Sequence, residues 1–145
     1  MGLLEWLTGG GVRPKPEVHD EVLGTLIWSD DEDGWMGTAS GFSFSLGYGK
    51  GEAPDESLVA YARALLSTPE WLVQELDAAK ARQHDEFGPH LEAELKELRY
   101  ELVAIYQHKG RNRVIASLGP GPGRDHRAWR IEFSGRECEG IGFDS

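Results

Sequence analysis

Hydrophobic and polar positions divide the chain into a strand region, a helical region and a second strand region. Residues 21–29 form an apolar, β-branched run of strand length, and residues 34–49 alternate between apolar and small polar side chains. The alternating run places on one face Phe42, Phe44, Leu46 and Tyr48. Period-two alternation is typical of a strand with one buried face. We expect the two runs to pair as an antiparallel hairpin with the acidic segment 30–33 at its tip.

Helical spacing begins after residue 54. Asp55 is a suitable N-cap, and one helix face then holds Leu58, Val59, Ala62, Leu65 and Leu66. A second helix is predicted from the N-cap Thr68 to about Gln83, with a buried side made of Leu72, Leu76 and Ala79. Gly88-Pro89 interrupts the pattern, and residues 90–98 predict a short third helix or a helical lead-in.

Strand periodicity returns after residue 99. Four strands are predicted at residues 100–108, 113–119, 128–135 and 138–144. The order of strands, helices and strands favours an α+β fold. We therefore expect an antiparallel sheet, built from an N-terminal hairpin and a C-terminal meander, with two or three helices packed on one face. Residues 1–18 are predicted to form an amphipathic turn and a Gly/Pro-rich linker, and residues 19–145 a single domain.

Charge is spread unevenly along the 145 residues, whose net charge is −10. Residues 1–108 hold 8 Lys/Arg and 20 Asp/Glu, whereas residues 109–136 hold 7 Lys/Arg and 2 Asp/Glu. An acidic surface repels nucleic acid and attracts cationic partners, so we expect a basic protein partner and no nucleic acid. The basic segment is expected to lie against acidic helices of the same molecule. A sheet that binds RNA is the alternative, with the residues Arg111, Arg113, Arg127, Arg130 and Trp129.

Membrane association is not expected, because no apolar run approaches the roughly 20 residues of a membrane span. The start of the chain carries Glu5 and lacks the features of a secretory signal. The single cysteine, Cys138, cannot form an internal disulfide, which favours a reducing compartment and hence the cytoplasm. The oligomeric state stays open.

The acidic segment Asp30, Asp31, Glu32 and Asp33 has two interpretations. A calcium loop aligned on Gly34 would use Ser29, Asp31 and Asp33, but it would need a bidentate Glu where Ser40 stands. A hairpin tip needs only the turn chemistry of Asp and Gly, with clustered charge at a sheet edge. We expect the tip, without excluding a weakly bound cation. Trp35 beside these acids is expected at an interface, because binding hot spots resemble aromatic anchors rimmed by charge.

Three further motifs contain groups that are typical of chemical sites. His84, His90 and Glu92 lack the i, i+4 histidine spacing of a helical zinc site. The loop 119–123 contains two prolines, which remove backbone donors that a phosphate would need. Cys138 could act as a nucleophile only beside a base, the candidates being His126, Asp125 and His108. We expect no catalytic residues, no metal and no cofactor.

The layout resembles small bacterial α+β domains of unknown function, some of which act as immunity proteins in polymorphic toxin systems. The segments that carry the resemblance are "LGTLIWSDDEDGWMG", "LLSTPEWLVQELDAAKA" and "AWRIEFSGRECEGIGFD". It covers residues 20–145 and brings no catalytic signature. It implies an α+β fold and leaves the function open.

These observations favour a non-catalytic, cytoplasmic, immunity-like module that binds or neutralises a basic protein, such as a nuclease toxin. The predicted partner-binding residues are Asp30, Asp31, Glu32, Asp33 and Trp35. The alternative is a small hydrolase that depends on Cys138 or on a metal held by His84 and His90.

Overall fold

A computed structural model describes residues 16–47, 53–82, 84–120 and 127–144. Eight strands and three helices occur in these ranges. The N-terminal half contains β1 (Glu17–Asp20), β2 (Gly24–Ser29), β3 (Gly34–Ala39), β4 (Phe42–Gly47), α2 (Glu56–Leu66) and α3 (Glu70–Ala81). The C-terminal half contains α4 (Pro89–Lys96), β5 (Arg99–His108), β6 (Arg111–Gly119), β7 (Ala128–Ser134) and β8 (Glu137–Asp144).

All eight strands form one sheet whose spatial order follows the chain from β1 to β8. Each neighbouring pair is antiparallel except β4 and β5, which run parallel with Ser45 opposite Ala104. The three helices form the crossover between these two central strands, and parallel neighbours require a long connection of this kind. The α+β class is therefore confirmed, with three helices. The sheet is not wholly antiparallel as predicted, because it joins two four-stranded meanders through one parallel pair.

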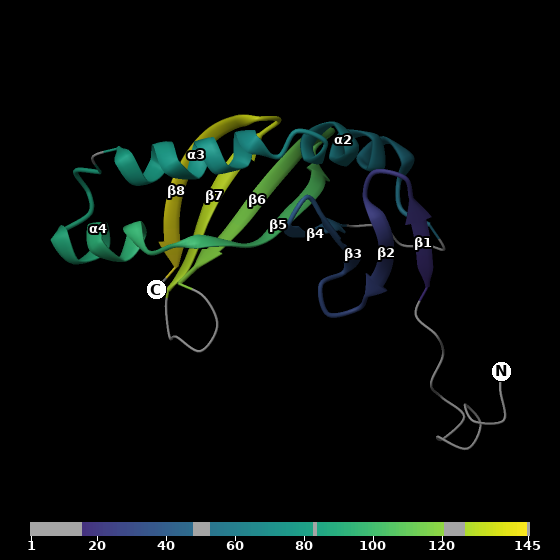
Figure 1. The fold of residues 1–145 in the computed structure, drawn as a ribbon, viewed down its shortest axis with the longest axis horizontal. Helices are drawn as coiled ribbons and strands as arrows, with labels where there is room; N and C mark the ends of the chain where they lie inside the picture. Colours follow the sequence, from purple (N-terminus) through teal and green to yellow (C-terminus); the bar gives the residue numbers. More distant parts are fainter. Residues whose placement is uncertain (1–15, 48–52, 83, 121–126, 145) are drawn as a thin grey trace, which may run out of the picture.

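The hydrophobic core lies between the helices and one face of the sheet. In Figure 1, α2 and α3 follow one another along the sheet while α4 returns beside α3. The strand side chains that are no more than 1% exposed are those facing the helices: Leu26, Trp35, Phe44, Leu46, Val103, Ile105, Val114, Ala116, Leu118, Trp129, Ile131 and Phe133. Aromatic rings connect the layers, since Trp71 meets Phe133 edge to face at 5.3 Å. We call this side of the sheet the helix face.

Polar bonds fasten the helices to the strands at specific points. The Tyr100 hydroxyl donates to the Leu72 carbonyl at 2.6 Å, which joins β5 to α3. From the β7–β8 turn, Arg136 Nη2 donates to the Ala64 carbonyl at 2.6 Å, in the last turn of α2. A cation is favourable there because the carboxyl end of a helix carries partial negative charge. The second meander is thus anchored to the helix that follows the first.

The opposite side of the sheet, which we call the open face, carries none of the described helices. Its side chains are those that alternate with the core residues, and most are half-buried or exposed. A row of cross-strand neighbours crosses this face from β2 to β6: Ile27, Met36, Ser45, Ala104 and Ile115. Because Ser45 and Ala104 have the smallest side chains of the row, the surface of the open face is depressed along the parallel pair β4–β5.

The N-terminal strands differ from the prediction at one point. Residues 34–49 were expected to form one strand, whereas β3 and β4 are separated by a two-residue turn at Ser40 and Gly41. Both residues have positive φ, 55° and 83°, as in the tight turns whose twist suits hairpins. The predicted side-chain pattern survives, since Phe42 and Phe44 pack with the core. Tyr48 lies outside the described residues.

The helix boundaries follow the sequence signals closely. Asp55 is the N-cap of α2 and accepts a hydrogen bond from the Leu58 N–H at 3.0 Å, as predicted. The next helix begins at Glu70 with Pro69 as its cap residue, so Thr68 does not cap it. It ends at Ala81, shortly before the predicted Gln83, which lies outside the described residues. The predicted third helix is α4.

The N-terminal boundary of the sheet lies earlier than predicted. Glu17 and Val18 were assigned to the linker, but they belong to β1 and pair with Ile27 and Leu26. The predicted amphipathic turn falls outside the described residues. In the part of the chain that the structure describes, none of the helices has the length and apolar character that crossing a bilayer requires.

Asp20 connects the first hairpin to α2. Its carboxylate accepts hydrogen bonds from the Leu23 N–H at 2.8 Å and from Arg63 Nε at 2.8 Å, and its side chain is only 5% exposed. The hydrogen bond from Arg63 is the largest cause that lowers the Asp20 pKa from 3.8 to about 2. The ionised form is therefore bound more favourably in the folded protein than in the unfolded chain.

We expect Asp20→Asn to lower the free energy of unfolding at neutral pH by about 1–2 kcal/mol, because the bond between the ionised carboxylate and Arg63 is lost. The loss is no larger because about half of the Arg63 side chain is exposed and screened by solvent. A lowered pKa contributes stability that is present above about pH 4 and is lost as the pH falls toward 2. Urea unfolding of both proteins between pH 7 and pH 2 measures the difference. A difference that stayed constant down to pH 2 would contradict an ionised Asp20 as its source.

Candidate binding groove on the open face

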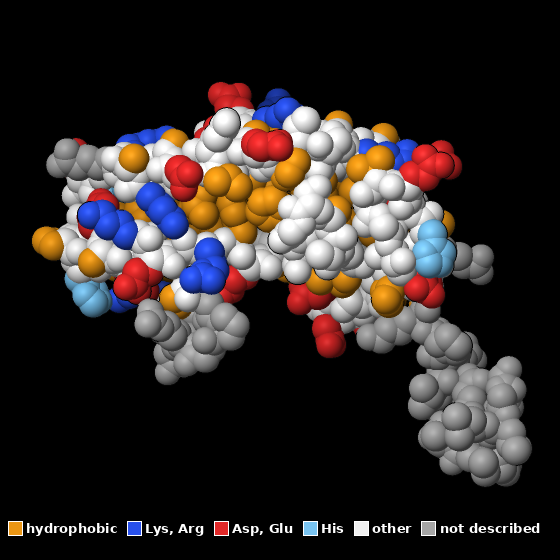
Figure 2. All heavy atoms as spheres, viewed as in Figure 1, with side chains coloured by type: hydrophobic (Ala, Val, Ile, Leu, Met, Phe, Trp, Pro, Cys, Tyr) orange, Lys and Arg blue, Asp and Glu red, His pale blue; other side chains and the backbone are white. Residues whose placement is uncertain are grey.

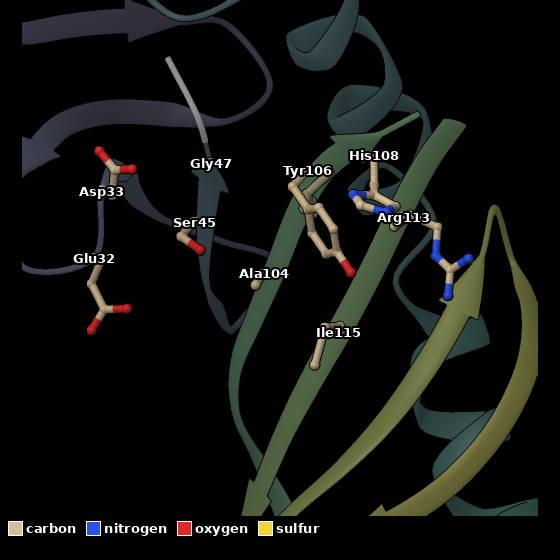
Figure 3. Close-up of a pocket in the computed structure, with 10 residues that line it drawn as sticks. Glu32, Asp33, Ser45, Gly47, Ala104, Tyr106, His108, Arg113 and Ile115 are labelled. Atoms are coloured by element: carbon tan, nitrogen blue, oxygen red, sulfur yellow. The ribbon is translucent and has the colours of Figure 1, made fainter. Parts of the chain in front are cut away.

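A groove of about 610 Å³ lies on the open face beside the β2–β3 turn. Figure 3 shows two groups of side chains across it, with Glu32 and Asp33 on one side and β5 and β6 on the other. The polar groups that line it are those of Glu32, Asp33, Ser45, Tyr106, His108 and Arg113. Its volume lies within the roughly 300–1,000 Å³ of ligand clefts in proteins. We call it the open-face groove.

The floor of the groove is formed by the parallel strands. Ser45 and Ala104 are cross-strand neighbours there, and Ile115 stands beside Ala104 on β6. Small side chains on the two central strands leave space that larger residues would fill. Ser45 is only 6% exposed, and Figure 3 shows its hydroxyl on the groove side of β4.

The acidic wall is the β2–β3 turn. It is the tip of a hairpin, as predicted. Ser29 and Gly34 are the last paired residues before the turn, and Trp28 pairs with Trp35 next to them. The Trp28 Nε1–H donates to the Asp30 carboxylate at 2.7 Å, which fixes the start of the turn to β2. Asp33 adopts a positive φ of 49°, a conformation that Asp tolerates in turns.

Three carboxylates of this turn are not neutralised within the described residues. Asp31, Glu32 and Asp33 are exposed, and none of them forms an ion pair with another described side chain. As for a metal, no group of three or more His, Cys, Asp or Glu side chains in the described ranges is arranged to hold one. Ser40, where a calcium loop would need a glutamate, instead occupies the β3–β4 turn.

Two arginines of the open face, Arg113 and Arg130, are paired in contrast. Arg113 Nη2 lies 2.6 Å from a Glu139 carboxylate oxygen, and Arg130 Nη1 lies 2.7 Å from that of Asp144. The prediction that the basic segment meets acidic helices is confirmed for Arg127, whose Nη1 lies 2.5 Å from the Glu94 carboxylate on α4. For Arg113 and Arg130 the partners are acids of β8, which lies next to β7 and two strands from β6.

Two tryptophans are placed differently from the sequence prediction. Trp35 is 0% exposed on the helix face, so the prediction that it anchors a partner at the surface is wrong. Alternation on β3 allowed either Trp35 or Met36 to face inward, and helix packing on one side decided for Trp35. Trp129, which the RNA-binding alternative required at the surface, is 1% exposed and packs against Phe143 at 4.8 Å.

The cysteine of the hydrolase alternative lies away from the groove. Cys138 packs against the helix-face core opposite Phe133, and burial raises the pKa of its thiol. A higher pKa lowers the thiolate fraction that a nucleophile needs. His108 lines the open-face groove on the other side of the sheet. His126 and Asp125 lie outside the described residues.

The two histidines of the metal-dependent alternative differ in their surroundings, since His84 is buried and His90 is exposed. His84 is 7% exposed, and its Nε2 lies 2.9 Å from the Ala79 carbonyl, so one ring nitrogen is already used in a buried hydrogen bond. Its ring lies 4.9 Å from that of Phe87. His90 is exposed in the first turn of α4. The structure gives His84 a packing role in the α3–α4 connection.

Sequence analysis identified the acidic wall but not the rest of the groove. Ser45, Ala104 and Tyr106 were missed because their proximity depends on the β4–β5 pairing across the helices. The one available signal was the small polar face of residues 43–47, which a buried strand would not need.

A second depression, lined by Phe42, Val73 and Tyr100, lies between α3 and the start of β5, where Figure 2 shows hydrophobic side chains gathered.

No family model matches the chain, and neither the curated proteins nor the solved structures yield a match.

Proposed function

We propose that the protein is a non-catalytic binding module that recognises a basic protein through the β2–β3 turn. The observation that carries this proposal is the charge arrangement of the open face. Arg113 and Arg130 are paired with acids of β8, whereas Asp31, Glu32 and Asp33 have no cationic partner among the described residues. The wall of the groove therefore presents negative charge to the solvent.

Unpaired carboxylates on a fixed turn suit the recognition of a cationic surface. Complementary charge increases the association rate and opposes the binding of acidic competitors. The Trp28–Asp30 hydrogen bond ties the start of the turn to β2, so less of the turn backbone has to be ordered when a partner binds. The net charge of −10 adds a long-range attraction for the same basic partner. An immunity-like role, in which the module neutralises its basic partner, is the form of this proposal that we favour.

A location in the cytoplasm belongs to the same proposal. Its support is the single free cysteine, which is compatible with a reducing compartment. No observation favours the hydrolase alternative, since the thiol of Cys138 is made less reactive by burial and His84 is engaged with Ala79.

The test is capture of the tagged protein from its source cells, followed by native mass spectrometry and association kinetics with the captured protein. We expect a stoichiometric basic partner. In the variant Asp31→Asn/Glu32→Gln/Asp33→Asn, we expect the association rate at low salt to fall by about tenfold or more, because steering by clustered charge reaches 10- to 1,000-fold. The dependence of the rate on salt is also expected to weaken.

A matched control removes three carboxylates elsewhere. Asp77, Asp85 and Glu86 are exposed on and after α3 and form no ion pair with described residues. The variant Asp77→Asn/Asp85→Asn/Glu86→Gln carries the same chemical changes and the same net charge. Equal association rates for the two variants would refute the turn as the recognition site. Recovery of the protein without any basic partner would refute the proposed function.

A further inference from the structure

The open-face groove contains a hydroxyl group that the fold itself does not use. Ser45 is 6% exposed as a whole, its hydroxyl forms no hydrogen bond with the described residues, and its oxygen is within reach of solvent in the groove. Such a hydroxyl can exchange its bond to water for one to a ligand that enters the groove. Figure 3 shows this hydroxyl between the acidic wall and Tyr106, directed into the groove.

The groove has two chemically different sides around that hydroxyl. Glu32 and Asp33 present carboxylates with no ion-pair partner among the described residues. On the other side, the Tyr106 ring and the Ile115 side chain provide an aromatic and an aliphatic surface. Arg113 also lines the groove, but its guanidinium is held by Glu139 at 2.6 Å. The groove thus combines hydrogen-bond acceptors, negative charge and an aromatic ring.

We propose that the open-face groove binds an arginine side chain from an extended segment of the basic partner. A guanidinium donates several hydrogen bonds in one plane, which suits two carboxylates and a hydroxyl that accept. The face of the same group stacks on aromatic rings such as that of Tyr106. The aliphatic stem of the arginine would lie over Ala104 and Ile115. The volume of about 610 Å³ leaves room for the backbone on either side of this residue.

This inference rests on the proposed function for the identity of the partner, but the groove can be tested alone. The probe is the pentapeptide acetyl-Gly-Gly-Arg-Gly-Gly-amide, titrated into the full ¹⁵N-labelled chain and followed by NMR. We expect saturable shifts at the amides of Ser45, Ala104 and Tyr106, with a Kd on the order of 1–10 mM. Replacing the arginine by its neutral isostere citrulline is expected to weaken binding by at least about tenfold, because charge-assisted hydrogen bonds are lost.

Two variants of the protein separate the groove from the rest of the open face. Ala104→Leu places an apolar side chain on the floor and is expected to abolish the shifts. Ala128→Leu is the matched control, because Ala128 is exposed on β7 outside the groove. Ser45→Ala removes only the hydroxyl and is expected to weaken binding severalfold. The ¹H–¹⁵N spectrum of each variant reports directly whether its fold is kept.

Several outcomes would overturn the inference. These are the absence of saturable shifts at about 10 mM peptide, equal binding of the citrulline peptide, and unchanged binding by Ala104→Leu. The result remains distinguishable from a failure of the proposed function. If Ala104→Leu captures the cellular partner normally while the triple turn variant does not, the groove assignment fails and the function stands. If the arginine peptide binds as expected but no basic protein is captured, the groove stands and the function fails.

Discussion

Replacing Trp35 by alanine is expected to lower the free energy of unfolding by about 3–5 kcal/mol, the range for truncating a large aromatic residue in a core. Its indole is 0% exposed and meets Trp28 edge to face at 5.6 Å. Losing the indole leaves a cavity beneath the β2–β3 hairpin that the strands cannot close fully. Urea unfolding monitored by circular dichroism measures the loss. It would be a large part of the 5–15 kcal/mol that usually stabilises a domain.

Two further variants, Ile27→Ala and Trp35→Phe, serve as controls for Trp35→Ala. Ile27 lies on the open face of the same hairpin and is 41% exposed, so Ile27→Ala is expected to cost less than about 1 kcal/mol. The Trp35 Nε1–H has no hydrogen-bond partner among the described residues, so Trp35→Phe, which removes that donor, is expected to cost less than Trp35→Ala. A stability loss for Trp35→Ala no larger than that of Ile27→Ala would contradict the buried position of this tryptophan.

Substituting Gly34 by alanine is expected to destabilise the protein by about 2–3 kcal/mol, at the upper part of the usual cost of overpacking. A Cβ atom at this position would lie 2.7 Å from the Leu46 carbonyl oxygen and 3.2 Å from the Gly47 Cα. Both contacts are with backbone atoms of β4, which cannot move aside as a side-chain end can. The strands β3 and β4 would have to separate locally.

Gly34 also joins the acidic turn to β3, so the same change reaches the groove. Displacement of the backbone here moves Asp33 relative to Ser45, and we expect Gly34→Ala to weaken binding of the arginine peptide as well as stability. The control is Gly140→Ala on β8, where a Cβ would meet no atom within 4 Å. Denaturation curves of the two variants check the prediction. Similar midpoints for both would mean that the close approach of β3 and β4 is not maintained.

Both predictions concern contacts that the local pattern could not specify. The alternation of residues 34–49 was correctly interpreted as strand, but Ser40 and Gly41 fit the alternation and concealed the turn between β3 and β4. Likewise, Trp35 and Met36 are adjacent, and on a strand adjacent side chains point to opposite faces. Nothing local decides which of them the helices cover.

The groove illustrates the same limit for function. Its acidic wall was predicted because Asp30–Asp33 is contiguous and its role as a hairpin tip depends on local turn chemistry. The floor joins Ser45 to Ala104, which are separated along the chain by all three helices. Since parallel pairing depends on where the crossover returns the chain, no short-range pattern indicates it.

The sequence by itself determined the positions of most strands and helices, the cap at Asp55 and the acidic turn, because hydrophobic periodicity and capping act within a few residues. The tertiary structure decided three things: the parallel junction of the two meanders, the burial of Trp35, and the pairing of Arg113 and Arg130 with acids of β8. Each of these depends on contacts between segments that are far apart along the chain and meet only when the sheet has formed and the helices cover one of its faces. The proposed role of the unpaired carboxylates of the β2–β3 turn depends on that arrangement.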